Sequence, residues 1–172
     1  MVIITSREVI IRPAQLDDIN GIRQVAKITW QSTYGSIYSQ EFIHSFLEQA
    51  YSVNSLEMAV TRVKTYNPRK FLVAEVDGGL VGYAQLSEAD NGVSELSRIY
   101  VLPEFHGQGI GRSLLNELLS SDDSIQKIFA WVEKENRVGL HFYQSSGFVF
   151  DGEMEESING QTMILHKFIK QR

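Results

Sequence analysis

The sequence predicts a mixed α/β (α+β) fold in which helices flank a central sheet of six or seven strands. Three observations carry this prediction: helical apolar spacing up to residue 66, short strand-like segments after residue 70, and a glycine-rich turn between a strand and a helix. The chain has 172 residues, of which 43% are hydrophobic, and this is enough to bury the core of one domain. We expect a single domain over residues 1–172.

Periodicity and turn residues give the order of the elements. A short strand over residues 8–12 precedes three helical segments, which begin near Leu16, Ser39 and Ser55, and the third ends before Asn67-Pro68. A hairpin turn at residues 77–79 joins strands 71–76 and 80–86. The remaining expected elements are strand 95–101, a helix containing residues 114–119, strand 128–132, a helix from 136 to 147, and strands 148–150 and 162–165, which are joined through residues 153–160.

The composition argues against several classes of protein. Cysteine is absent, so disulfides, thiolate metal sites and a cysteine nucleophile are excluded, and a reducing cytoplasm is the expected location. The net charge of −5 argues against a nucleic-acid partner. No apolar run approaches the roughly 20 residues that span a bilayer, and the first 13 residues lack the pattern of a signal peptide. The four histidines have no metal-ligand spacing, so we expect no metal.

A glycine-rich turn follows the strand that ends at Val101. Gly107, Gly109 and Gly111 allow the backbone to turn sharply and to bring its N–H groups close to a ligand. These groups open a helix, whose positive end favours phosphate, and Arg112 adds a fixed charge. The spacing fits neither the P-loop nor the dinucleotide-binding G-x-G-x-x-G pattern. A phosphate-binding turn is expected, and a turn without a ligand is the alternative.

Two segments of the chain resemble the signatures of a known family, the GNAT superfamily of N-acetyltransferases. The resemblance includes their spacing and the order of the strands and helices that contain them. Residues 106–112 resemble its motif A, [QR]-x-x-G-x-[GA], although His106 stands where Gln or Arg is usual, so that the charge there depends on pH. The resemblance runs over almost the whole chain and includes residues 11–14 and the hairpin 71–86. The segment that resembles motif B is Asn136-x-x-Gly139-x-x-Phe142-Tyr143-x-x-x-Gly147-Phe148.

The resemblance implies that acetyl-CoA is the co-substrate. In that family the coenzyme lies where strands 94–101 and 128–132 splay apart, its pantetheine arm pairs with the first of these strands, and the glycine turn holds its pyrophosphate. Asn136 would cap its helix and contact the pantetheine amide. The residues expected to bind the coenzyme are Ile99, Tyr100, Val101, His106, Gly107, Gln108, Gly109, Ile110, Gly111, Arg112, Asn136 and Tyr143.

The same resemblance implies direct transfer of the acetyl group, with Tyr143 protonating the departing thiolate of the coenzyme. Transfer to an amine also needs a base, because an alkylamine is almost fully protonated near pH 7. Glu95, at the start of a strand, is the candidate base, and a surface position is the alternative. Water relayed through Ser97 would be a substitute route.

The strand that contains Glu95 has an irregular apolar pattern. Leu96, Ile99 and Val101 cannot share one face under strict alternation, and one extra residue would bring them together as a β-bulge. In the family a bulge here directs a backbone N–H at the thioester oxygen, as an oxyanion hole does. The alternative is that Leu96 and Ile99 face opposite buried sides.

The acceptor amine is expected to bind the helices after the first strand. Residues 29–34 and 38–42 resemble the corresponding region of bacterial polyamine acetyltransferases of the PaiA type, and aromatic rings attract cations. Trp30, Tyr34 and Tyr38 are therefore candidate substrate residues, with packing between helix and sheet as the alternative. Spermidine or spermine is the leading small-molecule amine, and a protein or peptide N-terminus or another small amine is the alternative.

Two further questions stay open at the level of sequence. A GNAT-like domain can also be an acyl-CoA sensor or a structural module without catalysis, and Tyr143 together with the intact glycine turn argues against this. The family often forms homodimers through its late strands. Residues 148–150 and 163–165 would serve in that role, but packing in the core explains them equally well.

Overall fold

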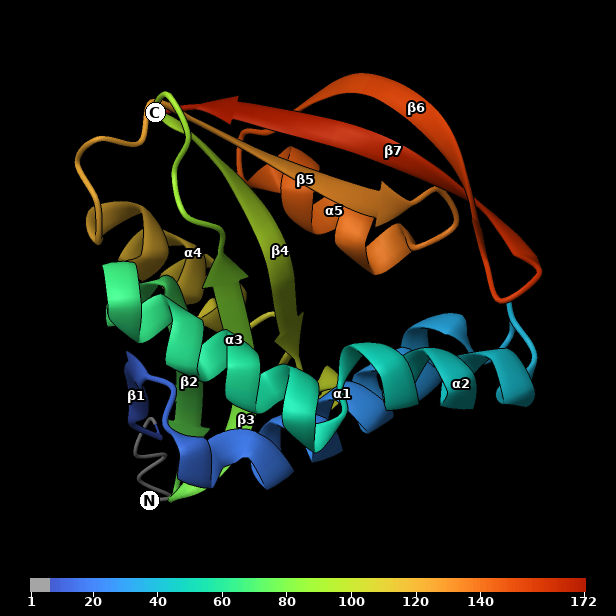
Figure 1. The fold of residues 1–172 in the computed structure, drawn as a ribbon, viewed down its shortest axis with the longest axis horizontal. Coiled ribbons are helices and arrows are strands. Elements are labelled where there is room, and N and C mark those ends of the chain that lie inside the picture. The colour runs from blue at the N-terminus through green and yellow to red at the C-terminus, as the bar shows by residue number, and fades with distance from the viewer. Residues whose placement is uncertain (1–6) are drawn as a thin grey trace, which may run out of the picture.

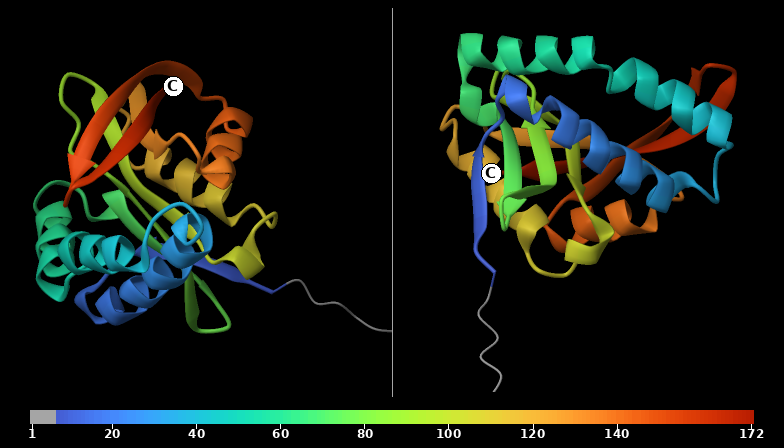
Figure 2. Two further views of the ribbon diagram at one scale, coloured as in Figure 1. Left: turned by 90° about the vertical axis from the view of Figure 1, so that its right-hand side faces the viewer. Right: turned by 90° about the horizontal axis from the view of Figure 1, so that it is seen from below.

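The computed structural model describes residues 7–172; residues 1–6, which belong to the segment considered above for a signal peptide, lie outside the described residues. Seven strands form one mixed sheet in the order β1-β2-β3-β4-β5-β7-β6. Helices α1, α2 and α3 lie on one face of the sheet, and α4 and α5 lie on the other (Figures 1 and 2). The predicted mixed α/β fold with flanking helices is confirmed.

The elements have the following bounds. The helices are α1 (Ile19–Tyr34), α2 (Gln40–Ala50), α3 (Val53–Tyr66), α4 (Ile110–Ser120) and α5 (Arg137–Ser145). The strands are β1 (Val9–Pro13), β2 (Phe71–Val76), β3 (Gly79–Leu86), β4 (Val93–Val101), β5 (Lys127–Glu133), β6 (Val149–Ile158) and β7 (Gln161–Gln171). Short 3-10 turns precede α1, β2 and α4 at Leu16–Asp18, Pro68–Lys70 and Pro103–Phe105. Among the described helices, none is long and apolar enough to cross a membrane.

The two late strands are longer than predicted, and this corrects the expected connection over residues 153–160. Residues 153–158 continue β6 and pair with β7, and the turn consists only of Asn159 and Gly160. Both turn residues have positive φ, 51° and 78°, which is the conformation that an Asn-Gly pair favours in a two-residue hairpin. The Asn-Gly pair was the signal for this hairpin in the sequence.

β4 and β5 pair only at one end and then separate (Figure 1). Their parallel pairing covers Val93–Glu95 and Lys127–Phe129, whereas β4 continues to Val101 along β3. The register along β3 shifts between Arg98 and Leu96, which leaves Ser97 as an extra residue. The predicted β-bulge is therefore confirmed. Leu96 and Ile99 contact the same apolar cluster, so the alternative with opposite buried sides is wrong.

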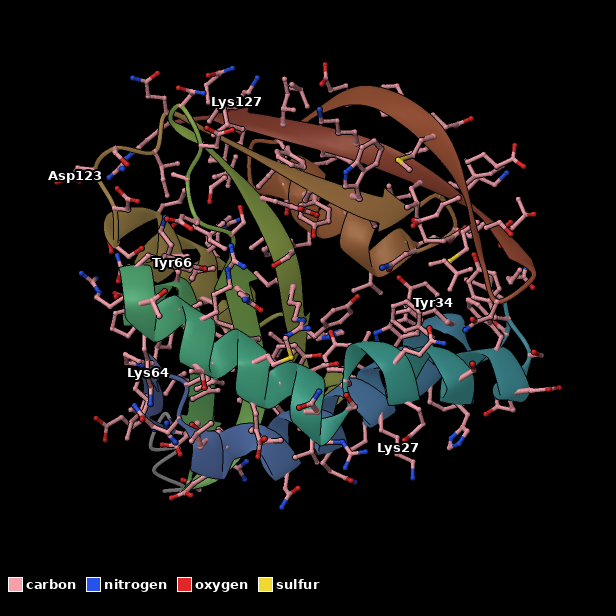
Figure 3. All side chains as sticks on the ribbon, viewed as in Figure 1. Lys27, Tyr34, Lys64, Tyr66, Asp123 and Lys127 are labelled. Carbon is pink, nitrogen blue, oxygen red and sulfur yellow. The ribbon has the colours of Figure 1, made fainter. Side chains whose placement is uncertain are left out.

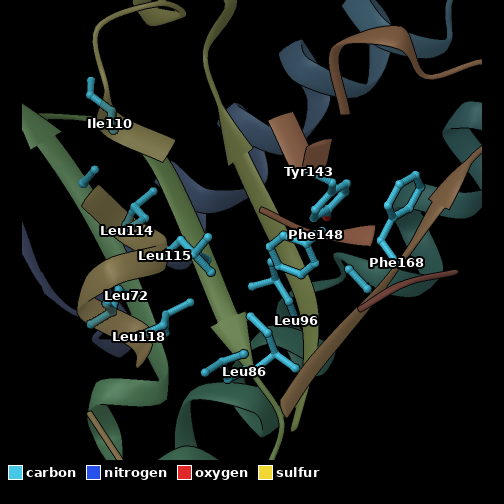
Figure 4. Close-up of a cluster of buried hydrophobic side chains, with 14 of the residues drawn as sticks. Leu72, Leu86, Leu96, Ile110, Leu114, Leu115, Leu118, Tyr143, Phe148 and Phe168 are labelled. Carbon is cyan, nitrogen blue, oxygen red and sulfur yellow. The ribbon is translucent and has the colours of Figure 1, made fainter. Parts of the chain in front are cut away.

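The largest apolar cluster joins the sheet to α4 and α5. Figure 4 shows the leucines of α4 directed at the strands, and three aromatic side chains grouped beyond Leu96. A second cluster joins the opposite face of the sheet to α1 and α3. Both faces of the central strands are thus covered by helices, and the opening between β4 and β5 interrupts the sheet. The α4 leucines of the first cluster are Leu114, Leu115 and Leu118, and its buried aromatic residues are Tyr143, Phe148 and Phe168.

A buried ion pair links the turn before β2 to the turn after α4. The Nζ atom of Lys70, a residue that is 2% exposed, lies 2.8 Å from Oδ2 of Asp122. Hydrogen bonds from Lys70 and Ser124 lower the pKa of Asp122 to about 2. The charge on this carboxylate therefore stabilises the fold above about pH 4, and this contribution is lost as the pH falls through about 2.

We expect Asp122→Asn to lower the free energy of unfolding by about 3 kcal/mol, because the buried ammonium of Lys70 loses its counter-charge. Urea denaturation at pH 7 measures this change. The matched control is Asp123→Asn, whose exposed carboxylate pairs with Arg172 at the surface and whose loss should have no measurable effect. Equal denaturation midpoints for the two variants would contradict the structural role of the pair.

Candidate active site

A cavity of about 510 Å³ occupies the opening between β4 and β5 and extends along the first turn of α4. β4 contributes every residue from Leu96 to Val101, including the expected pantetheine-binding residues Ile99, Tyr100 and Val101. Residues of α1, β5 and α5 complete the walls. The cavity thus reaches from the glycine turn on one face of the sheet to α1 on the other.

The glycine turn presents backbone donors without acceptors. Gly109 is the N-cap of α4 with φ 79°, Gly107 has φ 75°, and no side chain caps the helix. The first hydrogen bond of the helix runs from the N–H of Ser113 to the carbonyl oxygen of Gly109. Among residues 7–172, the N–H groups of 107–112 have no acceptor. These donors at a helix N-terminus can bind an anionic oxygen.

The three glycines of the turn have two different reasons to be glycine. A Cβ atom added at Gly107 or Gly109 would meet no protein atom within 4 Å, so the space beside them is open. A Cβ atom added at Gly111 would lie 3.1 Å from the ring of Phe142. Close packing of α4 on α5 therefore explains Gly111, while the positive φ explains the other two.

The side chains around the turn are anchored to the protein. Nε2 of His106 lies 2.7 Å from the carbonyl oxygen of Val101, and its backbone N–H donates to Pro103. The side chains of Gln108 and Arg112 donate to the carbonyl oxygens of Glu104 and Ser145. The ring of His106 is thus directed at β4 through Nε2, which leaves only Nδ1 for another partner.

Tyr143 lines the cavity, whereas Glu95, at the point where β4 and β5 stop pairing, does not. Tyr143 lines the cavity from α5, is 7% exposed, and packs between Phe148 and Phe168. Its hydroxyl forms no hydrogen bond with any other described residue. Burial, then Tyr34 and the charge of Glu95, raise the pKa of Tyr143, so its proton is retained at neutral pH. Burial also raises the pKa of the half-buried Glu95, the last residue of β4 that pairs with β5.

Asn136 and Tyr34 connect the two sides of the cavity. The side-chain oxygen of Asn136 accepts a hydrogen bond from the N–H of Gly139 at 2.8 Å and caps α5, as the sequence predicts. Its Nδ2 donates to the hydroxyl oxygen of Tyr34 at 3.2 Å. Figure 3 shows Tyr34 at the end of α1, and both residues line the cavity. This bond fixes the end of α1 relative to the start of α5.

The other two candidate substrate residues do not line this cavity, which is a correction to their expected position. Trp30 and Tyr38 pack with Tyr34 and two phenylalanines in a buried aromatic cluster, and they are 4% and 9% exposed. Trp30 stacks on Phe46 at a centroid distance of 4.1 Å. Packing between helices, the alternative left open by the sequence, is therefore the role that the structure gives to Trp30 and Tyr38. Of the three aromatic residues, only Tyr34 reaches the cavity.

Several residues of the cavity were not predicted. Trp131 of β5 and Arg98 of β4 line it, together with Thr29 and Thr33 of α1. Alternation along β5 would have placed Trp131 on the face opposite the buried Ile128 and Ala130, but it does not show that the face borders a cavity. Arg98 follows the bulge, so its face depends on the exact position of the extra residue.

The charge of the lining fits a polyanionic ligand. Among the described residues that line the cavity there is no Asp or Glu, whereas Arg98, His106, Arg112 and His141 are present. Together with the free N–H groups of the turn, these side chains make the walls suitable for a coenzyme that carries phosphates. The residues present therefore fit acetyl-CoA.

Comparison with known proteins agrees with this geometry. The sequence profile of the acetyltransferase (GNAT) family matches residues 29–148. The chain is 31% identical over 159 residues to a spermidine N(1)-acetyltransferase of Thermoplasma acidophilum, covering 91% of this chain and 95% of the relative. It is also 33% identical over 91 residues to the L-amino acid N-acyltransferase MnaT of Escherichia coli, which covers 49% of this chain and 53% of that protein.

A solved structure shares the whole architecture. The PaiA N-acetyltransferase from Thermoplasma acidophilum, in complex with coenzyme A, superposes with a TM-score of 0.79 at 30% identity and covers 96% of this chain and 99% of that chain. The family profile spans more than half of the present chain and includes the bulge, the glycine turn and Tyr143. The chain therefore belongs to the acetyltransferase (GNAT) family, and it is an N-acetyltransferase whose co-substrate is acetyl-CoA.

Proposed function

We propose that the protein, as a single domain over residues 1–172, transfers an acetyl group directly from acetyl-CoA to a primary amine of a small molecule. The observation that carries this proposal is the cavity in the β4–β5 opening, which is lined both by the glycine turn with its unpaired N–H donors and by the buried Tyr143. The absence of cysteine supports a cytoplasmic location, and the net charge of −5 argues against nucleic acid as a partner.

The backbone of the chain would hold the coenzyme. The N–H groups of residues 107–112 would bind the pyrophosphate, assisted by Arg112, and the edge of β4 over residues 99–101 would pair with the pantetheine arm where β5 has separated. Asn136 would fix the start of α5 against this arm. The side chains of His106 and Gln108 would shape the turn through their bonds to Val101 and Glu104.

Acetyl-CoA supplies the acetyl group as a reactive thioester. Glu95 would accept the proton of the acceptor amine, and its raised pKa keeps the carboxylate a stronger base than an exposed glutamate. Water held near Ser97 is the substitute route. Tyr143 would donate its proton to the departing sulfur, and a backbone N–H at the Ser97 bulge would polarise the thioester carbonyl. Tyr143 and Glu95 are therefore the proposed catalytic residues.

Two classes of acceptor have support. A polyamine such as spermidine or spermine is supported by the spermidine N(1)-acetyltransferase relative and by the aromatic ring of Tyr34 in the cavity. An amine that also carries a carboxylate is supported by Arg98 in the cavity wall and by the amino acid acyltransferase relative. An accessible N-terminus of a peptide is a third acceptor of the same chemistry.

Release of free thiol from acetyl-CoA over a panel of amines tests the proposal. Polyamines, amino acids, short peptides and simple alkylamines would each be supplied at saturating concentration, and the product would be identified by its added acetyl mass. We expect turnover with at least one acceptor. Tight binding of acetyl-CoA without thiol release for any amine would show that the chain is an acyl-CoA sensor instead.

The pH dependence of kcat tests the role of Glu95. Because burial raises the pKa of this carboxyl, we expect kcat to fall about tenfold per pH unit below a pKa that lies above the ordinary value for glutamate. The Glu95→Gln variant should have a lower kcat without this acid limb. An unchanged limb in the variant would assign the titration to another group. The exposed Glu88→Gln serves as the control and should keep the profile of the natural protein.

The oligomeric state is a separate question. Phe148 and Met163 belong to the core, whereas Val149 and Phe150 on the edge strand β6 are 60% and 57% exposed. A homodimer that covers these two side chains is compatible with this exposure, and light scattering of the purified protein would measure it.

A further inference from the structure

Arg98 is a positively charged residue in the wall of the cavity, where it would repel a cationic acceptor. It lines the cavity, and its guanidinium lies over the ring of Tyr51 at 4.9 Å from the centroid and over Phe71 at 5.8 Å. Its only hydrogen bonds among the described residues go to the side chain of Gln85 and the carbonyl oxygen of Ala50, each at 3.2 Å. Both partners are neutral, so part of the donor capacity of the guanidinium is unused.

No carboxylate balances this charge. Among residues 7–172 no Asp or Glu oxygen lies within 4.0 Å of the Arg98 guanidinium, whereas Arg12, Arg23 and Arg69 each have such a partner. The position is half-buried, and the cavity lining has no acidic residue. A half-buried cation is stabilised mainly when an anion binds beside it. Hydrogen bonds to neutral partners do not offset the free energy that the cation loses when it leaves water.

The bulge places Arg98 on the same face of β4 as Glu95. Leu96 and Ile99 both contact the core cluster beneath α4. Glu95 and Arg98, which alternate with them once Ser97 is counted as the extra residue, therefore point to the α1–α3 side. The ring contacts of Arg98 with Tyr51 and Phe71 lie on that side. With Ser97 as the extra residue, Glu95 and Arg98 stand two ladder positions apart, about 7 Å along the strand.

We propose that Arg98 binds a carboxylate of the acceptor and thereby selects amines of the amino acid type. This inference rests on the proposed acetyl transfer to a primary amine. A guanidinium offers paired donors that match a carboxylate. The carboxylate of an α-amino acid would bind Arg98 in the wall of the cavity.

This arrangement separates the two acceptor classes. A polyamine carries no anionic group for Arg98, and its second ammonium would meet a like charge in the cavity. An amino acid supplies the anion that Arg98 lacks. Removal of the carboxylate charge from the acceptor should therefore weaken the interaction with Arg98.

The experiment compares L-amino acids with their own amides, which have the same side chain but no carboxylate charge, and it compares the acid-to-amide ratio between variants because the amide also has a less basic amine. We expect the natural protein to favour the acid over the amide by about 10- to 100-fold in kcat/KM, which is the usual effect of a charged hydrogen-bonded pair. In Arg98→Met this ratio should fall by the same factor, about 10- to 100-fold relative to the natural protein, and in Arg98→Lys by less. Spermidine and putrescine are included as acceptors without a carboxylate.

The ratio does not depend on how much of a variant is folded, because acid and amide are measured with one preparation. Arg23→Met is the matched control: Arg23 donates to the carbonyl oxygen of Tyr51 but does not line the cavity, so the ratio should stay as in the natural protein. Equal use of acid and amide by the natural protein, an unchanged ratio in Arg98→Met, or a preference for spermidine over every amino acid would overturn the inference. Failure with all amines would instead contradict the proposed function.

Discussion

The Tyr143→Phe variant should bind acetyl-CoA almost as tightly as the natural protein while its kcat falls by roughly 10²–10⁴, the usual contribution of a general acid. The substitution keeps the ring and its contacts with Phe148 and Phe168 and removes only the hydroxyl. Burial and the charge of Glu95 raise the pKa of Tyr143, so the natural phenol keeps its proton across the assay range. The loss should therefore be largest at high pH, where water supplies fewer protons to the sulfur.

Stability distinguishes catalysis from a structural role. Because the hydroxyl of Tyr143 has no hydrogen-bond partner among the described residues, its removal leaves no buried group unsatisfied, and the free energy of unfolding should stay within about 0.5 kcal/mol. Tyr34→Phe is the matched comparison, since it removes the acceptor of the Asn136 amide and should cost about 1–3 kcal/mol. Full turnover in a folded Tyr143→Phe protein would assign the proton to solvent.

The order of elements could be predicted because its signals are local. Ser39 accepts a hydrogen bond from the N–H of Phe42 and caps α2, as its residue type and position indicate. The residues Asp77 and Gly78 adopt positive φ in a two-residue turn, and Gly147 ends α5 with φ 86°. Even the bulge could be predicted, because Leu96, Ile99 and Val101 can only share a face if one residue is extra.

The site was less predictable because it depends on distant contacts. Trp30 and Tyr34 lie four residues apart on one face of α1, yet only Tyr34 reaches the cavity, since α2 covers Trp30 with Phe46. Helical spacing cannot distinguish these two environments. The ring of His106 bonds to Val101, five residues earlier, through the fold of the intervening 3-10 turn. Residue type alone could not show this bond.

The length of the last hairpin was missed for a different reason. Residues 151–156 of β6 are mostly acidic and exposed, and such a segment has the composition of a loop. β6 is an edge strand, so only one side of its backbone is paired and both of its faces carry polar residues. Charged edge strands of this kind are common in natural sheets because they hinder association with other strands. Apolar alternation is therefore weakest where the strand is at the edge.

The Gly109→Ala variant should lose acetyl-CoA binding by at least about 100-fold. Gly109 has φ 79°, and an added Cβ would enter space that contains no protein atom within 4 Å, beside the free N–H groups of the turn. A methyl group there would keep an anionic oxygen from these donors. Loss of one or two charge-assisted hydrogen bonds, each about 1.5–3 kcal/mol, gives this weakening. Titration calorimetry measures the affinity.

Two controls separate this effect from backbone strain and from side-chain contacts. Gly160→Ala imposes the same strain, because Gly160 has φ 78° and equally open surroundings, but it lies in the β6–β7 turn and should bind acetyl-CoA normally. His106→Gln should change the affinity only a few-fold, because Nε2 of His106 is already engaged by the carbonyl oxygen of Val101. If Gly109→Ala binds acetyl-CoA within threefold of the natural protein while His106→Gln does not, then side chains rather than the backbone of the turn hold the coenzyme.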